Sequence, residues 1–152
     1  ALDQATQGFK DALTEKLGDA VSFKEGNASG DSANCSTIID GFLSDGVDLI
    51  LANATAPLQA AAAATSEIPI LGTSITDYAT ALEIDDWTGT VGSNIFGTSD
   101  LAPLDLQAAM LNEMFPDAQN VGLLYCYGEP NSIYQCDVIT GYLEEYCYYV
   151  ES

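Results

Sequence analysis

The chain has 152 residues, of which 47% are hydrophobic, and a formal net charge of −20 that comes from 23 acidic side chains and only three lysines. It contains no histidine and no arginine, and no cationic side chain follows Lys24. This charge argues against binding to nucleic acid or to anionic membrane surfaces, because both need cationic contacts, and the missing histidines exclude His-based catalytic triads and His-containing zinc sites.

The first part of the chain alternates between helical and strand-like patterns. Apolar residues at helical spacing predict a helix over residues 2–17 that ends at Gly18, and a strand follows near Ala20–Lys24. Asp31 or Ser32 is predicted to cap a second helix. The other elements predicted in this part are strands at Val47–Ala52, Ile68–Gly72 and Ser93–Phe96, a helix at Ala56–Ser66, and a short helix with an irregular loop within Tyr78–Val91.

The remainder of the chain continues this alternation. Its predicted elements are a helix at Pro103–Phe115, a strand at Val121–Tyr125, a helix at Asn131–Cys147 and the start of another strand at Tyr148–Val150. Such alternation predicts an α/β fold of doubly wound parallel sheets with helices on both faces. The chain begins with a helix that should follow a central strand and stops as a strand begins, so we expect it to be the interior of a longer protein.

One unit occurs three times: an apolar run, a short polar loop, and a proline that opens an amphipathic segment. The three loops are Asn53–Pro57, Gly97–Pro103 and Cys126–Ser132. Proline is tolerated in the first turn of a helix, and Thr, Ser or Asp just before it are natural helix caps. Each junction therefore predicts a strand that turns into a helix at the carboxyl edge of a sheet, where α/β proteins bind ligands.

The four cysteines do not form a metal-binding pattern. No CxxC pair occurs, and there is no histidine to complete a zinc site. Cys136 and Cys147 fall on one predicted helix, where they are too far apart to form a disulfide. We therefore expect free, mostly buried thiols, no metal site and no cofactor.

Several segments match one known family in order and spacing. They are Ala1–Leu13, Val47–Ile50 ahead of Ala54–Pro57, Ile68–Ile70 ahead of Thr76 and Asp77, and the motifs Thr98–Pro103 and Glu129–Ser132. Through these segments the chain resembles ABC-transporter substrate-binding proteins of the tryptophan/tyrosine-binding type, which have a type I-like periplasmic binding protein fold. The resemblance covers nearly the whole chain.

This resemblance implies a two-lobe protein that closes on a small ligand. Residues 1–98 would form the first lobe without its opening strand, and residues 99–152 would begin the second lobe. The implied function is non-catalytic: the solute-binding component of an ABC importer that delivers a small solute, with an aromatic amino acid favoured, to a membrane permease. The resemblance also implies an extracytoplasmic location and a lipid anchor.

The candidate ligand-binding residues lie in the predicted loops after the strands. They are Thr55, Thr73, Ser74, Asp77, Ser99, Asp100, Glu129, Asn131 and Ser132. Since the chain has no arginine, a ligand carboxylate must be met by helix N-termini and hydroxyl groups, and an ammonium group would pair with Asp77, Asp100 or Glu129. The aromatic residues that could stack on an aromatic ligand are Tyr78, Trp87, Tyr125 and Tyr127.

Each candidate also has a structural interpretation, and two other classes of function stay open. Thr55 could be a helix cap, the 73–77 loop could be a simple turn, and Glu129–Ser132 could only cap a helix. An assembly protein, completed by strand exchange between chains that self-associate, would cover the sheet edge left open by a missing strand. A racemase-like enzyme would use Cys126 as an acid/base thiol, although no second thiol or base is evident opposite it.

Overall fold

The computed structural model describes residues 2–152 and divides the chain into two compact units, the first ending at Asp100 and the second spanning Leu101–Ser152. Both units contain parallel strands joined by helices. The α/β class predicted from the sequence is therefore confirmed. Among the described residues, no helix combines the length and apolar character needed to cross a membrane.

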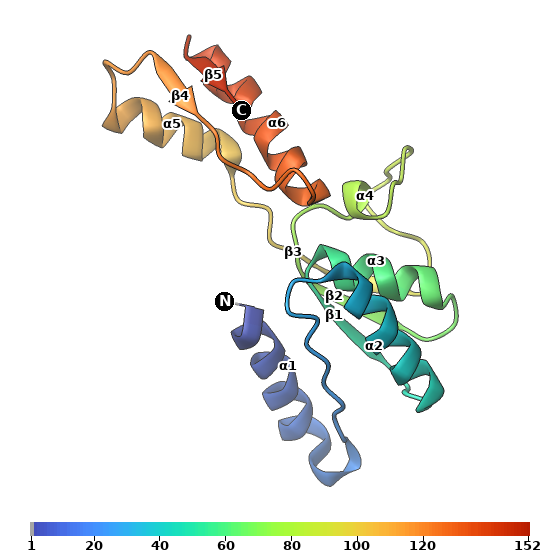
Figure 1. Ribbon diagram of the computed structural model, residues 1–152. Helices are drawn as coiled ribbons and strands as arrows, with labels where there is room; N and C mark the ends of the chain where they lie inside the picture. Colours follow the sequence, from blue (N-terminus) through green and yellow to red (C-terminus); the bar gives the residue numbers. More distant parts are fainter. Residues whose placement is uncertain (1) are drawn as a thin grey trace. The chain divides into compact units, whose positions relative to one another are not determined.

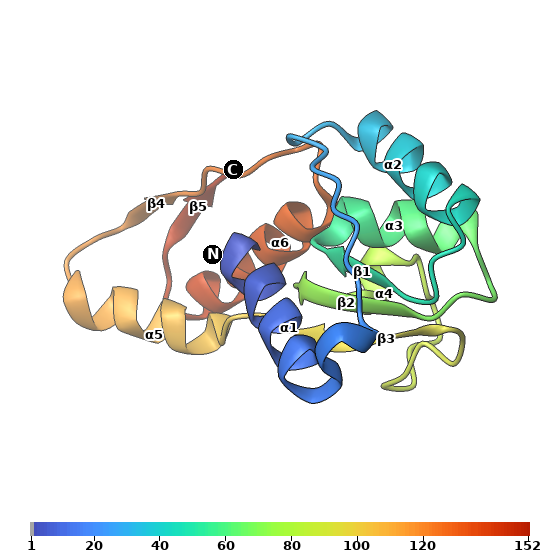
Figure 2. The same ribbon diagram turned by 90° about the horizontal axis from the view of Figure 1, so that it is seen from below.

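The first unit is built on a parallel sheet with the order β1 (Ile50–Asn53), β2 (Ile70–Ile75) and β3 (Ile95–Ser99). Its helices are α1 (Leu2–Leu17), a 3₁₀ turn at Gly18–Ala20, α2 (Ser32–Ser44), α3 (Thr55–Ala64) and α4 (Tyr78–Ala81). Figures 1 and 2 show α2 and α3 side by side over one face of the sheet and α1 on the other face.

The core of the first unit lies between the sheet and helices α2 and α3. Ile50 and Ile70 are register partners on adjacent strands and are at most 2% exposed. They pack with Ile39 of α2 and with Leu58 and Ala61 of α3. No residue of α1 is buried. Because the hydrophobic stabilisation scales with the apolar area removed from water, the α2–α3 face contributes most of the stability of this unit.

The predicted start of α2 is confirmed in detail. Asp31 is the N-cap residue, and its Oδ1 accepts a hydrogen bond of 2.9 Å from the backbone N–H of Ala33. This bond satisfies one of the backbone donors that every helix leaves open in its first turn.

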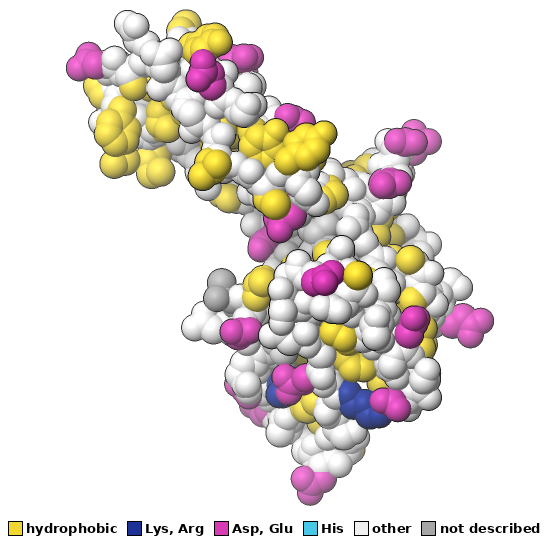
Figure 3. All heavy atoms as spheres, in the orientation of Figure 1, with side chains coloured by type: hydrophobic (Ala, Val, Ile, Leu, Met, Phe, Trp, Pro, Cys, Tyr) yellow, Lys and Arg dark blue, Asp and Glu magenta, His cyan; other side chains and the backbone are white. Residues whose placement is uncertain are grey.

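The strand predicted near Ala20–Lys24 is wrong. Residues 21–28 have no regular secondary structure and form no ladder in the described part of the chain, where β1 pairs only with β2. The segment is instead held by ion pairs between Lys10 and Glu25 and between Lys24 and Asp45. Lys10 also lies 5.7 Å from the ring centre of Phe23. Figure 3 shows cationic side chains on the first unit beside acidic ones.

The second unit is smaller and has a thinner core. It contains α5 (Leu104–Met114), β4 (Asn120–Gly122), α6 (Pro130–Glu145) and β5 (Tyr149–Glu151), with β4 and β5 in parallel register. Its buried cluster consists of Ala108, Leu143 and Tyr148. Leu106, Met110 and Met114 are more than half exposed along one side of α5, where hydrophobic side chains gather in Figure 3.

Several predicted boundaries differ from the structure. β1 begins at Ile50 rather than Val47, and β4 ends at Gly122 rather than Tyr125. Helix α6 ends at Glu145, so the prediction that Cys136 and Cys147 share a helix is wrong. Cys147 has a φ of +65°, which is incompatible with a continuing right-handed helix. The prediction that most of the cysteines are buried is also wrong: Cys35 and Cys136 are buried, whereas Cys126 and Cys147 are exposed.

Candidate functional site

Hydrogen bonds join the loops that leave β1, β2 and β3. The backbone N–H of Ala54, after β1, donates to the carbonyl oxygen of Thr73 in β2 at 3.0 Å. The backbone N–H of Asp100, after β3, donates to the Ile75 carbonyl at 2.9 Å, and Ser99 Oγ donates to the Thr76 carbonyl at 2.8 Å. The carboxyl ends of the three parallel strands therefore form one continuous edge that carries six of the nine predicted ligand-binding residues.

The exit from β1 is strained. Ala54 has φ +96° and ψ 166°, a backbone region that is essentially restricted to glycine and costs about 1–3 kcal/mol in other residues. Ala54 is also the N-cap of α3 and makes no side-chain capping bond, so the alternative interpretation of Thr55 as the cap does not hold. Thr55 is the first residue of α3 and is only 7% exposed. The start of α3 thus keeps backbone donors that no capping side chain covers.

The exit from β2 holds three more predicted residues. β2 continues to Ile75 through residues predicted as a loop, and its register with β3 shifts between Gly72 and Ile75. Ser74 lies in this irregular stretch with a φ of +55°. Asp77 caps α4, because its Oδ1 accepts a hydrogen bond of 2.7 Å from the backbone N–H of Thr80. Asp77 therefore has a structural role as a helix cap, whether or not it also contacts a ligand.

Sequence reasoning missed two polar residues at this edge. Asn53, the last residue of β1, donates from Nδ2 to the Leu2 carbonyl at 2.7 Å and to Thr6 Oγ1 at 2.9 Å. Its Oδ1 is buried and has no partner among the described residues, and a buried polar atom without a hydrogen bond costs about 1–3 kcal/mol. Thr76 is 9% exposed. The sequence could have indicated both residues, because each is a polar residue at or directly after the end of a strand that begins with apolar residues.

The electrostatics of the edge favour a cation. Asp77 and Asp100 both lie at the exits of β2 and β3, and the sequence offers no cationic side chain after Lys24 to neutralise them. The pKa of Tyr78 is raised, first by burial and then by the negative charge of Asp100. Within residues 2–152 neither carboxylate forms an ion pair, so an ammonium group at this edge would be attracted to both.

The other three predicted residues lie at the start of α6 in the second unit. Glu129 is the N-cap residue but makes no side-chain bond to the helix backbone. Its Oε2 accepts a hydrogen bond of 3.1 Å from Ser132 Oγ, and its carbonyl accepts from the backbone N–H of Ser132 at 3.0 Å. The carbonyl of Asn131 accepts a hydrogen bond from Gln135 Nε2 at 3.3 Å. The carboxylate of Glu129 is thus oriented by a hydroxyl group rather than used as a backbone cap.

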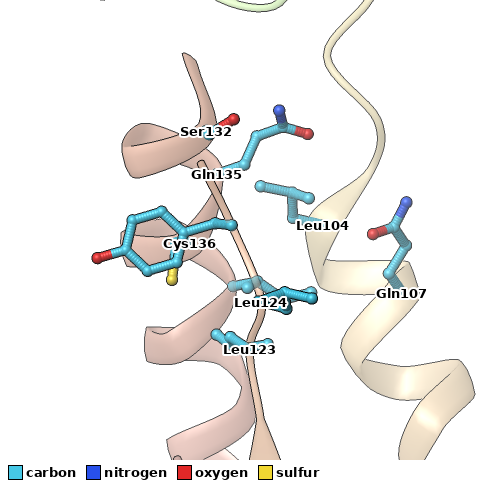
Figure 4. Close-up of a pocket in the computed structure, with 9 residues that line it drawn as sticks. Leu104, Gln107, Leu123, Leu124, Ser132, Gln135 and Cys136 are labelled. Atoms are coloured by element: carbon cyan, nitrogen blue, oxygen red, sulfur yellow. The ribbon is translucent and has the colours of Figure 1, made fainter. Parts of the chain in front are cut away.

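The second unit also contains an open pocket of about 260 Å³. Figure 4 shows it between α5, α6 and the segment after β4. Its lining consists of Leu104, Gln107, Leu123, Leu124, Tyr125, Ser132, Gln135, Cys136 and Ile139. Only Ser132 belongs to the predicted ligand-binding residues. The lining contains no acidic or basic side chain, so this pocket suits an apolar or amide-bearing group better than a charged one.

The four candidate stacking residues have different environments. Tyr78 is 8% exposed and belongs to the core of the first unit, so it is not available for stacking on a ligand. Trp87 and Tyr127 are exposed, and Tyr125 lines the pocket of the second unit. Residues 2–152 contain no group of three or more His, Cys, Asp or Glu side chains placed to hold a metal ion.

Comparisons with known proteins agree on one family. The model of the family described as "ABC transporter substrate binding protein" matches residues 1–151. The chain is 35% identical to a tyrosine-binding protein of Clostridioides difficile (strain R20291), over 99% of this chain and 44% of that protein.

Two solved structures are similar to the chain over nearly its whole length. The fold is similar to an "ABC domain" from Streptococcus pneumoniae in complex with L-Trp (TM-score 0.89, 30% identity, 99% of this chain and 51% of that one). It is also similar to a conserved domain protein from Vibrio cholerae (TM-score 0.90, 28% identity, 98% of this chain and 51% of that one). The chain therefore spans about half the length of the relatives that it matches.

Proposed function

The chain belongs to the family of ABC transporter substrate-binding proteins, and we propose that it is part of a protein that binds an aromatic amino acid and delivers it to a membrane permease for import. The similarity to a structure with L-Trp bound, at 30% identity over nearly the whole chain, is the observation that carries this proposal. We further propose a two-lobe protein that acts outside the cytoplasm and is held there by a lipid anchor.

The edge formed by β1, β2 and β3 supports this ligand class. A free amino acid carries one ammonium and one carboxylate group. Asp100 supplies a carboxylate for the ammonium group, and the uncapped start of α3 beside Thr55 offers backbone donors for the carboxylate. In this proposal Thr73, Ser74 and Ser99 supply hydroxyl groups at this edge, and Asp77 is a second carboxylate for the ammonium group. Glu129, Asn131 and Ser132 are proposed as ligand contacts of the second unit.

Titration of the full-length protein with amino acids tests the proposal. We expect L-tyrosine or L-tryptophan to raise the melting temperature and to bind in calorimetry, with leucine, a hexose and a nucleoside as comparison ligands. A shift caused only by the sugar or the nucleoside would contradict the ligand assignment and leave the family intact.

A matched pair of variants tests the role of Asp100. Asp100→Asn should weaken amino-acid binding about 10- to 100-fold, because a hydrogen bond to a charged group contributes about 1.5–3 kcal/mol. Asp40→Asn is the control, because Asp40 is exposed on α2 and carries the same charge. Equal affinities of the two variants would remove Asp100 from the proposed site.

Self-association is a second candidate, and one observation favours it. β1 forms a ladder on one side only, and the buried Oδ1 of Asn53 at its end has no donor among the described residues. A strand that is unpaired on one side can pair with another chain. We therefore expect the 152-residue chain alone to form dimers or larger assemblies in light scattering. A monodisperse species of 16.0 kDa that unfolds cooperatively would contradict this.

No specific observation favours the racemase-like alternative with Cys126.

A further inference from the structure

Two glycines face each other on neighbouring strands just before the candidate ligand site. Gly72 of β2 and Gly97 of β3 are register partners. A Cβ atom on Gly72 would overlap the Tyr78 hydroxyl and would lie 3.1 Å from both Tyr78 Cε1 and Ile75 Cγ1. A Cβ atom on Gly97 would overlap the same hydroxyl and the carbonyl oxygen of Gly72. The two missing side chains therefore leave a gap that the phenol end of Tyr78 fills.

Tyr78 connects this gap to the loops that carry the candidate ligand contacts. Its side chain is buried, and its hydroxyl group donates a hydrogen bond of 3.4 Å to the carbonyl of Thr98. Thr98 is followed directly by Ser99 and Asp100, which bond to the carbonyls of Thr76 and Ile75. Tyr78 thus contacts the end of β3 from the helix that Asp77 caps.

We propose that Tyr78 is a positioning residue of the ligand site, which fills the gap left by Gly72 and Gly97 and thereby holds Thr98–Asp100 against the exit of β2. This inference rests on the proposed amino-acid-binding function. In this proposal Tyr78 does not contact the ligand. It sets the distance between the β2 and β3 exits, and with it the position of the Asp100 carboxylate that meets the ammonium group.

The gap provides a direct test by paired substitution in the full-length protein. Gly72→Ala places a methyl group where the Tyr78 hydroxyl lies, so we expect the affinity for the bound amino acid to fall about 10- to 100-fold, as it would if the charged hydrogen bond from Asp100 were lost. Tyr78→Phe removes the hydroxyl and leaves the ring, so its own effect should be about threefold or less, in line with the loss of one neutral hydrogen bond.

The decisive variant is the combination of both changes. In Gly72→Ala/Tyr78→Phe the new methyl group occupies the space that the hydroxyl has left. Only the two tight contacts at 3.1 Å remain, so the affinity should return close to that of Tyr78→Phe alone. Such non-additivity is the measure of direct coupling between two residues. Gly41→Ala is the matched control, because a Cβ atom at this exposed position of α2 has no neighbour within 4 Å.

Calorimetric affinities measured well below each melting temperature separate positioning from stability. An unchanged affinity of folded Gly72→Ala, with only its melting temperature lowered, would overturn the positioning role. If Gly72→Ala does not fold, Tyr78→Leu replaces it: we expect weaker binding for Leu and near-parent binding for Phe, and equal affinities would overturn the proposal. Failure of the parent protein to bind any amino acid would instead overturn the proposed function, and the positioning role with it.

Discussion

The two units share the strand–loop–helix pattern but differ in how many hydrogen bonds hold the loops after their strands. In the first unit three adjacent strands end at one edge, and each loop finds a partner on its neighbour, such as the Thr73 carbonyl for the Ala54 N–H. In the second unit only β4 and β5 are paired. The loop after β4 is tied to β5 at its first residue, where the backbone N–H of Leu123 donates to the Glu151 carbonyl at 2.8 Å, and the next residue, Leu124, is fully exposed.

This difference shows that a sequence motif alone does not order the loops at the edge of a sheet. The repeated motif predicted three equivalent junctions, yet the junctions at Asn53–Pro57 and Gly97–Pro103 are fixed by hydrogen bonds to β2. The junction at Cys126–Ser132 has mainly local bonds, such as that between Glu129 and Ser132. Hydrogen bonds from a neighbouring strand hold a loop in one conformation, whereas the motif determines only which polar side chains the loop carries.

The largest expected difference between the units concerns their cores. Leu58 and Leu143 are both completely buried, but Leu58 belongs to a cluster of ten buried residues whereas Leu143 belongs to a cluster of three. We expect Leu58→Ala to cost about 3–5 kcal/mol and Leu143→Ala about 2–3 kcal/mol, because a small open core can collapse around the cavity. Hydrogen exchange, followed separately in each unit, measures both losses. Equal losses would mean that the second core is as rigid as the first.

Helix capping provides a second comparison. Asp31 caps α2 with its side chain, whereas Glu129 at the same position of α6 makes no such bond. Asp31→Ala should therefore destabilise the first unit by about 1 kcal/mol, and Glu129→Ala should change stability by less than about 0.5 kcal/mol. Urea unfolding of both variants distinguishes these values. A loss of about 1 kcal/mol in Glu129→Ala would reveal a capping role that the geometry does not contain.

The stability of the first unit should also depend on alkaline pH through Tyr78. Its pKa is raised above the ordinary 10.0 by burial and then by Asp100, so the folded chain holds the phenol proton more tightly than the unfolded chain. This contribution is present below about pH 10 and is lost as the pH rises through the folded-state pKa. Tyr78→Phe should therefore show a shallower loss of stability above pH 10 than the parent chain, measured by urea unfolding. Parallel curves would remove Tyr78 as the cause.

The smallest effect is expected at the surface. The ion pair between Lys24 and Asp45 measures 2.6 Å, but both side chains are about half exposed. Lys24→Gln should cost no more than about 0.5 kcal/mol, and this difference should vanish at high salt. Thermal unfolding at low and high sodium chloride tests both statements. A salt-independent loss would indicate that Lys24 acts through packing of its aliphatic stem.

The sequence predicted those elements whose causes are local. The spacing of apolar residues in Leu2–Leu17 and the cap at Asp31 act within one helix, and both predictions agree with the structure. The strand predicted at Ala20–Lys24 failed because a ladder needs a partner that no local pattern reveals. The extension of β2 through Thr73–Ile75 was hidden by polar residues that favour loops, although Thr73 pairs with Asn53 of β1 and Ile75 pairs with Ser99 of β3.

The candidate site was predictable in its chemistry and not in its geometry. Polar residues after apolar runs indicated the edge, but the same rule gave no reason to expect that Thr55 would not cap its helix or that Asp77 would cap one. Tyr78 was interpreted as a possible stacking residue. Its burial depends on the absence of side chains at Gly72 and Gly97, which are distant in sequence from each other and adjacent only in the sheet.

The backbone of Ala54 has a consequence for laboratory evolution. Its φ of +96° suits glycine, so Ala54→Gly releases strain in the folded chain while it adds freedom to the unfolded one. A selection for heat resistance alone would depend only on the balance between the strain released in the folded chain and the freedom added to the unfolded chain. A selection for ligand affinity would keep the alanine, whose narrower choice of conformations holds the start of α3 in place. The two selections should therefore diverge at this single position.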